Sequence, residues 1–108
     1  MELKELKISD KENSFKFVLI VNDKEVGFGY IFNREINPIE VYIEKEFQSN
    51  GYGKFLFNSL LSILKEKGLK GMLFKINESN YKFINIIQKA GAQIIGKQDL
   101  DIKFVLKI

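Results

Sequence analysis

Gln48-Ser49-Asn50-Gly51-Tyr52-Gly53-Lys54 is the stretch that decides how this sequence folds. It lies between a short apolar run, Val41-Tyr42-Ile43, and a helical pattern that begins at Phe55. Its two glycines allow a tight turn, and they let several backbone N–H groups approach one point with no Cβ in the way. A helix N-terminus adds about half a positive charge to those donors. The stretch therefore predicts a site for a phosphate or pyrophosphate, although two such glycines also occur in plain turns.

The spacing around this loop resembles the acetyl-coenzyme A signature of the GNAT superfamily of N-acetyltransferases, commonly V-x-P-x-x-[RQ]-G-x-G-x-G. Ile43 and Gln48 are five residues apart, and Gly51 and Gly53 match two of the three signature glycines. Ser49 stands at the first of these three positions. The loop is therefore identified as a cofactor loop of this family in which one glycine has been replaced.

A second segment resembles the family's N-x-x-A-x-x-x-Y-x-K-x-G-F motif. Asn80 and Gly91 are eleven residues apart, and Lys89 is also in place. Two positions depart from the family pattern, since Lys45 replaces the usual proline of the first motif and Ile87 replaces the usual tyrosine of the second. Together the two motifs cover about half of the chain.

The strand and helix patterns predict a single α/β (α+β) domain, residues 1–108, in the order β-β-β-β-α-β-α-β-β. The expected strands are 3–8, 15–21, 25–32, 39–43, 70–76, 93–96 and 102–108, and the expected helices are 51–67 and 80–90. By pattern alone residues 3–8 fit either a strand or the start of a helix, and the family resemblance favours the strand. A helix that joins two parallel neighbouring strands requires a right-handed crossover. The middle of the chain is therefore expected to form a βαβ unit in a GNAT-like mixed sheet.

The resemblance implies where the cofactor, acetyl-coenzyme A, binds. In the family it lies in a V that opens between the two central parallel strands, which here are 39–43 and 70–76. Backbone groups of one strand would bind the pantetheine arm, and N–H groups of the glycine loop would bind the pyrophosphate. The cofactor residues implied in this way are Val41, Ile43, Gln48, Ser49, Asn50, Gly51, Tyr52, Gly53, Lys54 and Asn80.

Transfer of the acetyl group to an amine implies further roles. The amine must lose a proton, the oxyanion needs a hydrogen-bond donor, and the departing thiolate needs a proton. Glu40 is the candidate base, Asn80 is the motif asparagine, and Tyr42, with Tyr81 as an alternative, is the candidate acid in place of the family's tyrosine. Plainer roles stay open for each: an exposed carboxylate, a helix cap, or a partly buried aromatic ring.

Composition excludes several classes of protein. The 108-residue chain has no cysteine and no histidine, so a disulfide framework, a zinc finger and a cysteine nucleophile are excluded, and we expect no metal site. No apolar run approaches the ~18 residues of a membrane span. We therefore expect a soluble, cytoplasmic protein.

Charge is divided unevenly along the chain. Residues 1–50 carry seven Lys/Arg against ten Asp/Glu, and residues 51–108 carry ten against four, so the basic half holds the phosphate loop. Sixteen lysines against one arginine argue against nucleic-acid binding, because arginine supplies most bidentate contacts to bases and phosphates.

The acceptor side of the fold is expected to be open. Family members usually place two helices between their first two strands, whereas only residues 9–14 are available here. An open groove suits a protein or peptide amine. If the apolar strand 102–108 forms a free edge, we expect a homodimer that covers it. The alternative is a monomer in which the charges of Lys103 and Lys107 protect the edge from pairing. A non-catalytic acyl-coenzyme A binding domain and a small interaction domain are the alternatives to an N-acetyltransferase.

Overall fold

The computed structural model of the protein describes residues 2–9 and 14–108. Most of the expected polar loop from Ser9 to Ser14 lies outside the described residues. All nine predicted elements form in the predicted order, and one short 3-10 helix, η1, is added. The strands are β1 (Glu2–Ser9), β2 (Ser14–Val21), β3 (Lys24–Ile31), β4 (Ile39–Ile43), β5 (Gly71–Asn77), β6 (Gln93–Gln98) and β7 (Asp101–Lys107). The helices are η1 (Lys45–Phe47), α1 (Tyr52–Glu66) and α2 (Tyr81–Lys89).

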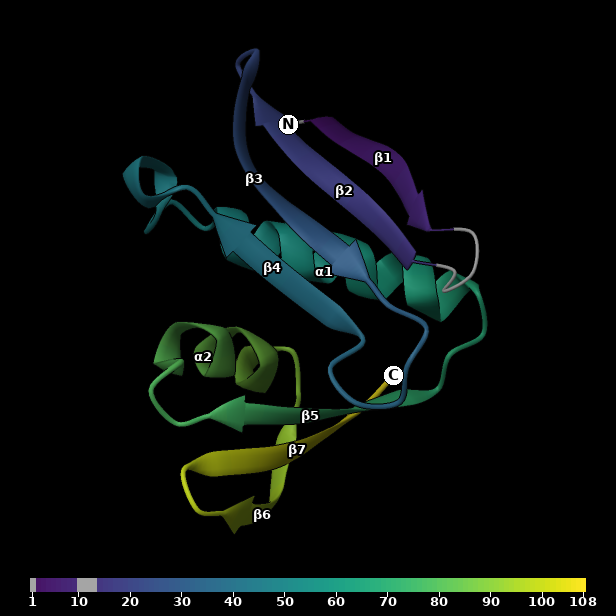
Figure 1. Cartoon of the computed structure of the whole chain (residues 1–108), viewed down its shortest axis with the longest axis vertical. Helices are drawn as coiled ribbons and strands as arrows, with labels where there is room; N and C mark the ends of the chain where they lie inside the picture. Colours follow the sequence, from purple (N-terminus) through teal and green to yellow (C-terminus); the bar gives the residue numbers. More distant parts are fainter. Residues whose placement is uncertain (1, 10–13) are drawn as a thin grey trace.

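The strands form two antiparallel sheets where the sequence predicted one mixed sheet (Figure 1). One sheet has the order β1-β2-β3-β4 and the other has the order β5-β7-β6. Among the described residues, the sheets are joined by one isolated parallel bridge, between Ile36 and Leu73. The predicted crossover is present as β4-α1-β5, but β4 and β5 diverge from that bridge instead of pairing along their length. This divergence corresponds to the V that the family resemblance implied.

β7 is the central strand of the second sheet, so the prediction that it forms a free edge is wrong. It pairs with β5 on one side and with β6 on the other. The turn at Asp99-Leu100, where Asp99 has a φ of 55°, folds β6 directly back onto β7. The homodimer argued from this edge loses its basis and stays a prediction. The outer strand is β6, whose Ile94 and Ile95 are 57% and 58% exposed.

α1 packs on one face of the four-stranded sheet (Figure 1). Its buried residues, Leu56, Phe57 and Leu60, recur at helical spacing. Gly29 of β3 allows the close contact, since a Cβ there would lie 2.7 Å from Leu60 Cδ1 and 3.0 Å from the Glu40 carbonyl oxygen. Strand alternation then directs the neighbouring side chains of β3 to the opposite face of the sheet, which α1 does not cover.

α2 lies in the gap between the two sheets (Figure 1). Phe83 of this helix contacts Phe57 of α1 and Phe74 of β5, with ring centroids 5.8 Å and 5.9 Å away. Edge-on contacts of this kind add stability beyond the buried area alone. The three rings tie both helices to β5, and they hold the second sheet at a fixed distance from the first.

Candidate active site

β4 presents alternate backbone groups to the cleft between the sheets. The Glu44 N–H donates to the Val26 carbonyl of β3 (2.9 Å), so the even-numbered residues of β4 direct their backbone groups toward β3. Alternation turns the N–H and C=O groups of Val41 and Ile43 to the other edge, toward β5. The Ile43 carbonyl there accepts a hydrogen bond from Gln48 Nε2 (3.1 Å). Both predicted pantetheine residues therefore lie on the cleft edge.

A cavity of about 100 Å³ lies between the diverging strands. Its walls come from β4, β5, α2 and the loop before β4, and the lining residues are Asn37, Ile39, Glu40, Val41, Tyr42, Ile76, Asn80 and Phe83. The three predicted catalytic residues, Glu40, Tyr42 and Asn80, are thus brought to one cavity. A fold that separates β4 from β5 creates this space, because paired strands would leave no room between them.

The predicted anion loop keeps a left-handed backbone at two positions. Gly51 is the N-cap of α1 and has a φ of 79°. Ser49, which stands at the first signature glycine, has a φ of 67° although it carries a side chain. Asn50 holds the turn by donating from Nδ2 to the carbonyls of Phe47 (3.1 Å) and Gln48 (3.3 Å). Ser49 therefore adopts the kind of backbone conformation that favours glycine, at a position where the signature has one.

The first turn of α1 offers three backbone donors. The Phe55 N–H makes the first helical hydrogen bond, to the Gly51 carbonyl (3.0 Å), so the N–H groups of Tyr52, Gly53 and Lys54 have no acceptor within the helix. The turn contains no acidic side chain that could take them. Together with the positive end of the helix dipole, these donors fit a pyrophosphate.

Gly53 has a packing role that sequence reasoning did not assign to it. A Cβ at this position would lie 3.2 Å from Ile86 Cδ1 and 3.6 Å from Ile43 Cγ1. The glycine therefore lets α1 approach both β4 and α2. Gly51 differs, since a Cβ there would meet no atom within 4 Å, and only its backbone conformation favours glycine.

Gln48 and Lys82 connect the end of β4 to the first turn of α2. Gln48 donates from Nε2 to the Ile43 carbonyl (3.1 Å) and accepts at Oε1 from Lys82 Nζ (2.9 Å). An ammonium group is thereby held beside the anion loop by a hydrogen bond, although both Lys82 and Lys54 are exposed. Sequence reasoning missed Lys82, because nothing distinguished it among sixteen lysines.

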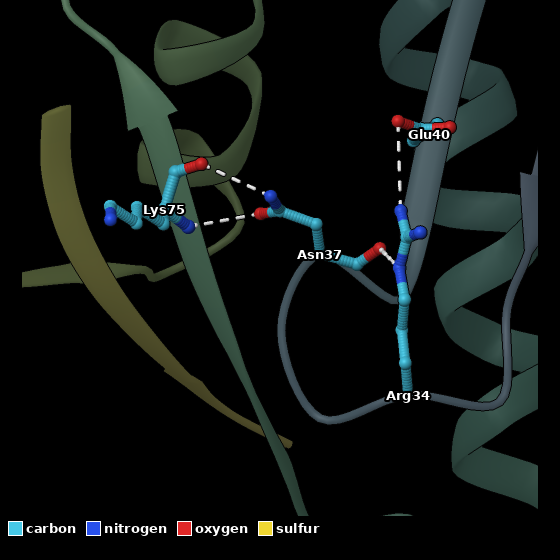
Figure 2. Close-up of polar contacts among 4 residues, drawn as sticks. All are labelled: Arg34, Asn37, Glu40 and Lys75. Carbon is cyan, nitrogen blue, oxygen red and sulfur yellow. Dashed lines mark hydrogen bonds and ion pairs between the residues drawn. The ribbon is translucent and has the colours of Figure 1, made fainter.

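Glu40 lies beside the only arginine of the sequence, Arg34. Arg34 Nη2 is 3.6 Å from Glu40 Oε1, and Arg34 Nε donates to the Asn37 carbonyl (3.0 Å; Figure 2). Both charged side chains are partly exposed, so the pair adds at most about 1 kcal/mol to stability. Its consequence is that the Glu40 carboxylate is held beside the loop that carries Asn37. Arg34 is a second residue that sequence reasoning missed.

Tyr42 places a protonated phenol at the cavity, although its surroundings make it a weaker acid than an ordinary tyrosine. Partial burial raises the pKa of its hydroxyl above the ordinary value, and the charge and hydrogen bonding of Glu40 raise that pKa further. The ring stacks on Phe28, with the centroids 5.2 Å apart. The hydroxyl therefore keeps its proton at neutral pH. Tyr81, the alternative acid, is 69% exposed and does not line the cavity.

Tyr42→Phe is expected to remove a late step from the alkaline titration of tyrosinate absorbance. The raised pKa means that this phenol ionises at higher pH than an ordinary tyrosine, and the chain has four tyrosines to compare. We expect only a modest loss of turnover, because a thiol with a pKa near 8.5 leaves as an anion without much assistance. Tyr81→Phe is the control and should keep the late step; a late step that survives Tyr42→Phe would contradict the assignment.

Asn80 begins α2, but its side chain makes no capping hydrogen bond. Its backbone N–H donates to the Asn77 carbonyl (2.9 Å), and its side chain lines the cavity. Asn77 uses its own side chain locally, since Oδ1 accepts from the N–H and the hydroxyl of Ser79. Ile87, at the family's tyrosine position, is fully buried in the core, so this position supplies no donor to the cleft.

Two negative findings concern the described part of the chain. Within residues 2–9 and 14–108, no three His, Cys, Asp or Glu side chains are grouped as a metal site would need. In the same residues, no helix has the length and apolar character required to span a bilayer.

The fold is similar to that of several solved acetyltransferases. PaiA N-acetyltransferase from Thermoplasma acidophilum, solved in complex with coenzyme A, is 16% identical, with a TM-score of 0.73 over 88% of this chain and 61% of that chain. The GNAT-family acetyltransferase of Streptococcus pneumoniae is 20% identical, with a TM-score of 0.74 over 89% of this chain and 67% of that chain. The chain thus spans roughly two thirds of the length of these two enzymes.

A structure from Klebsiella pneumoniae matches almost end to end. It is 13% identical, with a TM-score of 0.79 over 98% of this chain and 96% of that chain. No curated protein matches the sequence. The model of the acetyltransferase (GNAT) family matches residues 2–92, which is most of the chain and includes the anion loop, the cleft and α2. The chain therefore belongs to the GNAT family of acetyltransferases.

Proposed function

We propose that this protein is an N-acetyltransferase that transfers the acetyl group of acetyl-coenzyme A to a primary amine of a protein or peptide in the cytoplasm. The observation that carries the proposal is the cavity between β4 and β5, which is lined by Glu40, Tyr42 and Asn80. A carboxylate, a phenol and an amide meet there beside a strand edge and a helix N-terminus. The family assignment supplies the reaction class, and these residues supply its acid, base and hydrogen-bond donor.

The residues at the cleft fit acetyl-coenzyme A. The N–H groups of Tyr52, Gly53 and Lys54 would hold the pyrophosphate, and the Lys82 ammonium would balance its charge. The free backbone edge at Val41 would pair with the amides of the pantetheine arm, much as a peptide strand pairs with an exposed sheet edge. When bound, acetyl-coenzyme A supplies an acetyl group activated as a thioester.

The side chains in the cavity divide the proton transfers among them. Glu40 takes a proton from the acceptor ammonium, directly or through one water, which frees the nitrogen lone pair for attack. The Asn80 amide donates to the oxygen that becomes negative during attack. Tyr42 donates its proton to the departing sulfur. The base step is expected to contribute a factor of about 10² to 10⁴ in rate, and the acid step less, because a thiol with a pKa near 8.5 leaves readily as its anion.

The uncovered face of the first sheet supports a large acceptor. α1 covers one face, and the other face carries a row of aromatic rings: Phe28, Tyr30, Phe32 and Tyr42. The Lys16 ammonium lies 4.6 Å from the centroid of the Phe28 ring, so these rings can accommodate cationic side chains. A flat aromatic face next to the cavity suits an extended peptide better than a small, enclosed amine.

One observation favours the non-catalytic acyl-coenzyme A binding domain as a second candidate. Ile87 is fully buried at the position where the family usually has a tyrosine, so the usual acid is absent. A protein of this kind would retain the anion loop and the strand edge and would transfer nothing. Turnover separates the two candidates, because both require cofactor binding.

The test is a thermal-stability titration with acetyl-coenzyme A, followed by product analysis with peptide N-termini and lysine peptides. Ligand at a hundred times its dissociation constant is expected to stabilise the protein by about 2.7 kcal/mol. Binding followed by acetylated peptide supports the transferase. Binding without any acetylated product favours the non-catalytic binding domain. A melting temperature that acetyl-coenzyme A does not change would contradict both the transferase and the binding domain.

A further inference from the structure

Asn37, in the loop between β3 and β4, uses its side-chain amide to form the hydrogen bonds to β5 that a neighbouring strand would form. Its Nδ2 donates to the Lys75 carbonyl (3.1 Å), and its Oδ1 accepts from the Lys75 N–H (2.9 Å; Figure 2). Its backbone N–H donates to the Leu73 carbonyl (2.9 Å). Asn37 thus provides hydrogen-bond partners for the outward-facing backbone groups of Leu73 and Lys75 in β5. The two sheets separate immediately beyond this residue.

The loop holds Asn37 in place from its other side. The residue has a φ of 53°, a left-handed conformation that asparagine tolerates better than most residues. Arg34 Nε donates to its carbonyl (3.0 Å), and the same guanidinium lies beside Glu40. The side-chain amide of Asn37 is therefore fixed by its contacts to β5, and its backbone carbonyl is held by the arginine that pairs with the candidate base.

Asn37 also lies where two hollows of different size adjoin. It lines the cavity of about 100 Å³ that contains the candidate catalytic groups. Its close neighbours Arg34, Pro38 and Leu73 line a second hollow of about 970 Å³, which continues over apolar residues of the second sheet and α1. Removal of the Asn37 side chain would open the small cavity toward the large one.

We propose that the Asn37 side chain is the inner wall of the acyl site and restricts the protein to short acyl groups. This inference rests on the proposed function, since it assumes that the thioester lies in the smaller cavity. Asn37 forms part of the wall of this cavity of about 100 Å³, so an acyl chain that extends from the thioester toward β5 would meet the Asn37 amide. A longer chain would have to displace Asn37 and leave both backbone groups of Lys75 without their partners.

Asn37→Gly is the variant that opens the wall. Glycine adopts the left-handed backbone without strain and removes the side chain that separates the hollows. Asn37→Asp is the matched control, because aspartate has nearly the same size, tolerates the same backbone, and still accepts from the Lys75 N–H, although it loses the donor to the Lys75 carbonyl. The wall is therefore absent in the first variant and present in the second.

The measurement is kcat/KM for acetyl-, butyryl- and hexanoyl-coenzyme A with one acceptor, in the wild type and both variants. Two substrates that differ by one methylene in a fitted pocket typically differ by about 10- to 200-fold in kcat/KM. We expect Asn37→Gly to raise the butyryl-to-acetyl ratio at least tenfold and Asn37→Asp to leave it close to that of the wild type. An overall loss of stability changes all substrates together, so it does not imitate this change in ratio.

Dissociation constants for coenzyme A and its three thioesters separate this inference from the proposed function. If the wild type and Asn37→Gly each bind coenzyme A and its three thioesters with equal affinity, the cofactor site does not select by chain length. That result overturns the inference and leaves the proposed function in place. A protein that binds none of them overturns the proposed function and the inference together. Tighter binding of the longer thioesters by Asn37→Gly supports the wall even if no acceptor is acetylated.

Discussion

Gly51→Asp is expected to weaken the binding of acetyl-coenzyme A by about a hundredfold and to leave the fold at least as stable as the wild type. Gly51 is the N-cap of α1, and a side chain there would project into open space. Aspartate tolerates left-handed backbone, and a carboxylate at a helix N-terminus is stabilising. The same carboxylate would occupy the free N–H groups and repel the pyrophosphate. Stability and affinity should thus change in opposite directions.

The size of this effect follows from the repulsion between the two negative charges. Two unit charges about 4 Å apart repel by roughly 4 kcal/mol at an effective dielectric constant of 20, which is almost a thousandfold in the dissociation constant. Solvent around this exposed loop screens the repulsion, which reduces the expected loss to about a hundredfold. Calorimetric titration with acetyl-coenzyme A measures it.

Gly51→Asn is the matched control for that experiment. Asparagine has nearly the size and the backbone tolerance of aspartate and carries no charge, so we expect its affinity to lie close to that of the wild type. If the aspartate and asparagine variants bound equally well, the pyrophosphate would have to lie elsewhere. If both variants failed to bind, the bulk of an added side chain at this position, rather than its charge, would be what excludes the cofactor.

Apolar periodicity was sufficient to predict the elements but not the separation of the sheets. Leu56, Phe57 and Leu60 are buried as their helical spacing predicted, and the order of strands and helices is confirmed. The parting of β4 from β5 depends on Asn37, a polar residue in a loop, and on α2 in the gap. No pattern of apolar residues marks either feature, and the V between these two strands was expected only from the family resemblance.

The error over β7 has a different cause. Phe104 and Leu106 are buried on one face of the strand, whereas the other face carries the exposed Lys103 and Lys107 beside a partly buried Val105. This alternation identifies the face that packs on the core, but it does not tell an edge strand from a central strand of an antiparallel sheet. The same pattern was interpreted as an unprotected edge because the short turn at Asp99-Leu100, which brings β6 alongside, was predicted as a longer loop.

Residues of the candidate site were predictable where a local motif marked them. Asn80 and the loop from Gln48 to Lys54 follow from spacing along the chain. Lys82 and Asn37 act through partners 34 and 38 positions away, at Gln48 and Lys75, so only the folded chain brings them to the cleft. Contacts across such distances leave no signal in a single sequence.

Glu40→Gln is expected to lower turnover by about 10² to 10⁴ at neutral pH, with little change in the affinity for acetyl-coenzyme A. Glutamine keeps the shape of the side chain but cannot accept a proton from the acceptor ammonium. The lost ion pair with Arg34 is partly exposed and costs at most about 1 kcal/mol of stability, so the variant should fold. Glu44→Gln is the control, because Glu44 follows the same strand, is exposed, and does not line the cavity.

The pH dependence of the Glu40→Gln variant distinguishes a lost base from general damage to the site. A lysine acceptor has a pKa near 10.4, so below that pH its reactive neutral form increases about tenfold with each pH unit. A variant without a base depends on solvent to deprotonate the acceptor, and its rate should rise with pH until the deficit against the wild type nearly disappears close to pH 10. A misplaced thioester or a distorted cavity would leave the same deficit at every pH. A deficit that stays constant across this range would therefore remove Glu40 from the role of base and leave it as a residue that orients the site through Arg34.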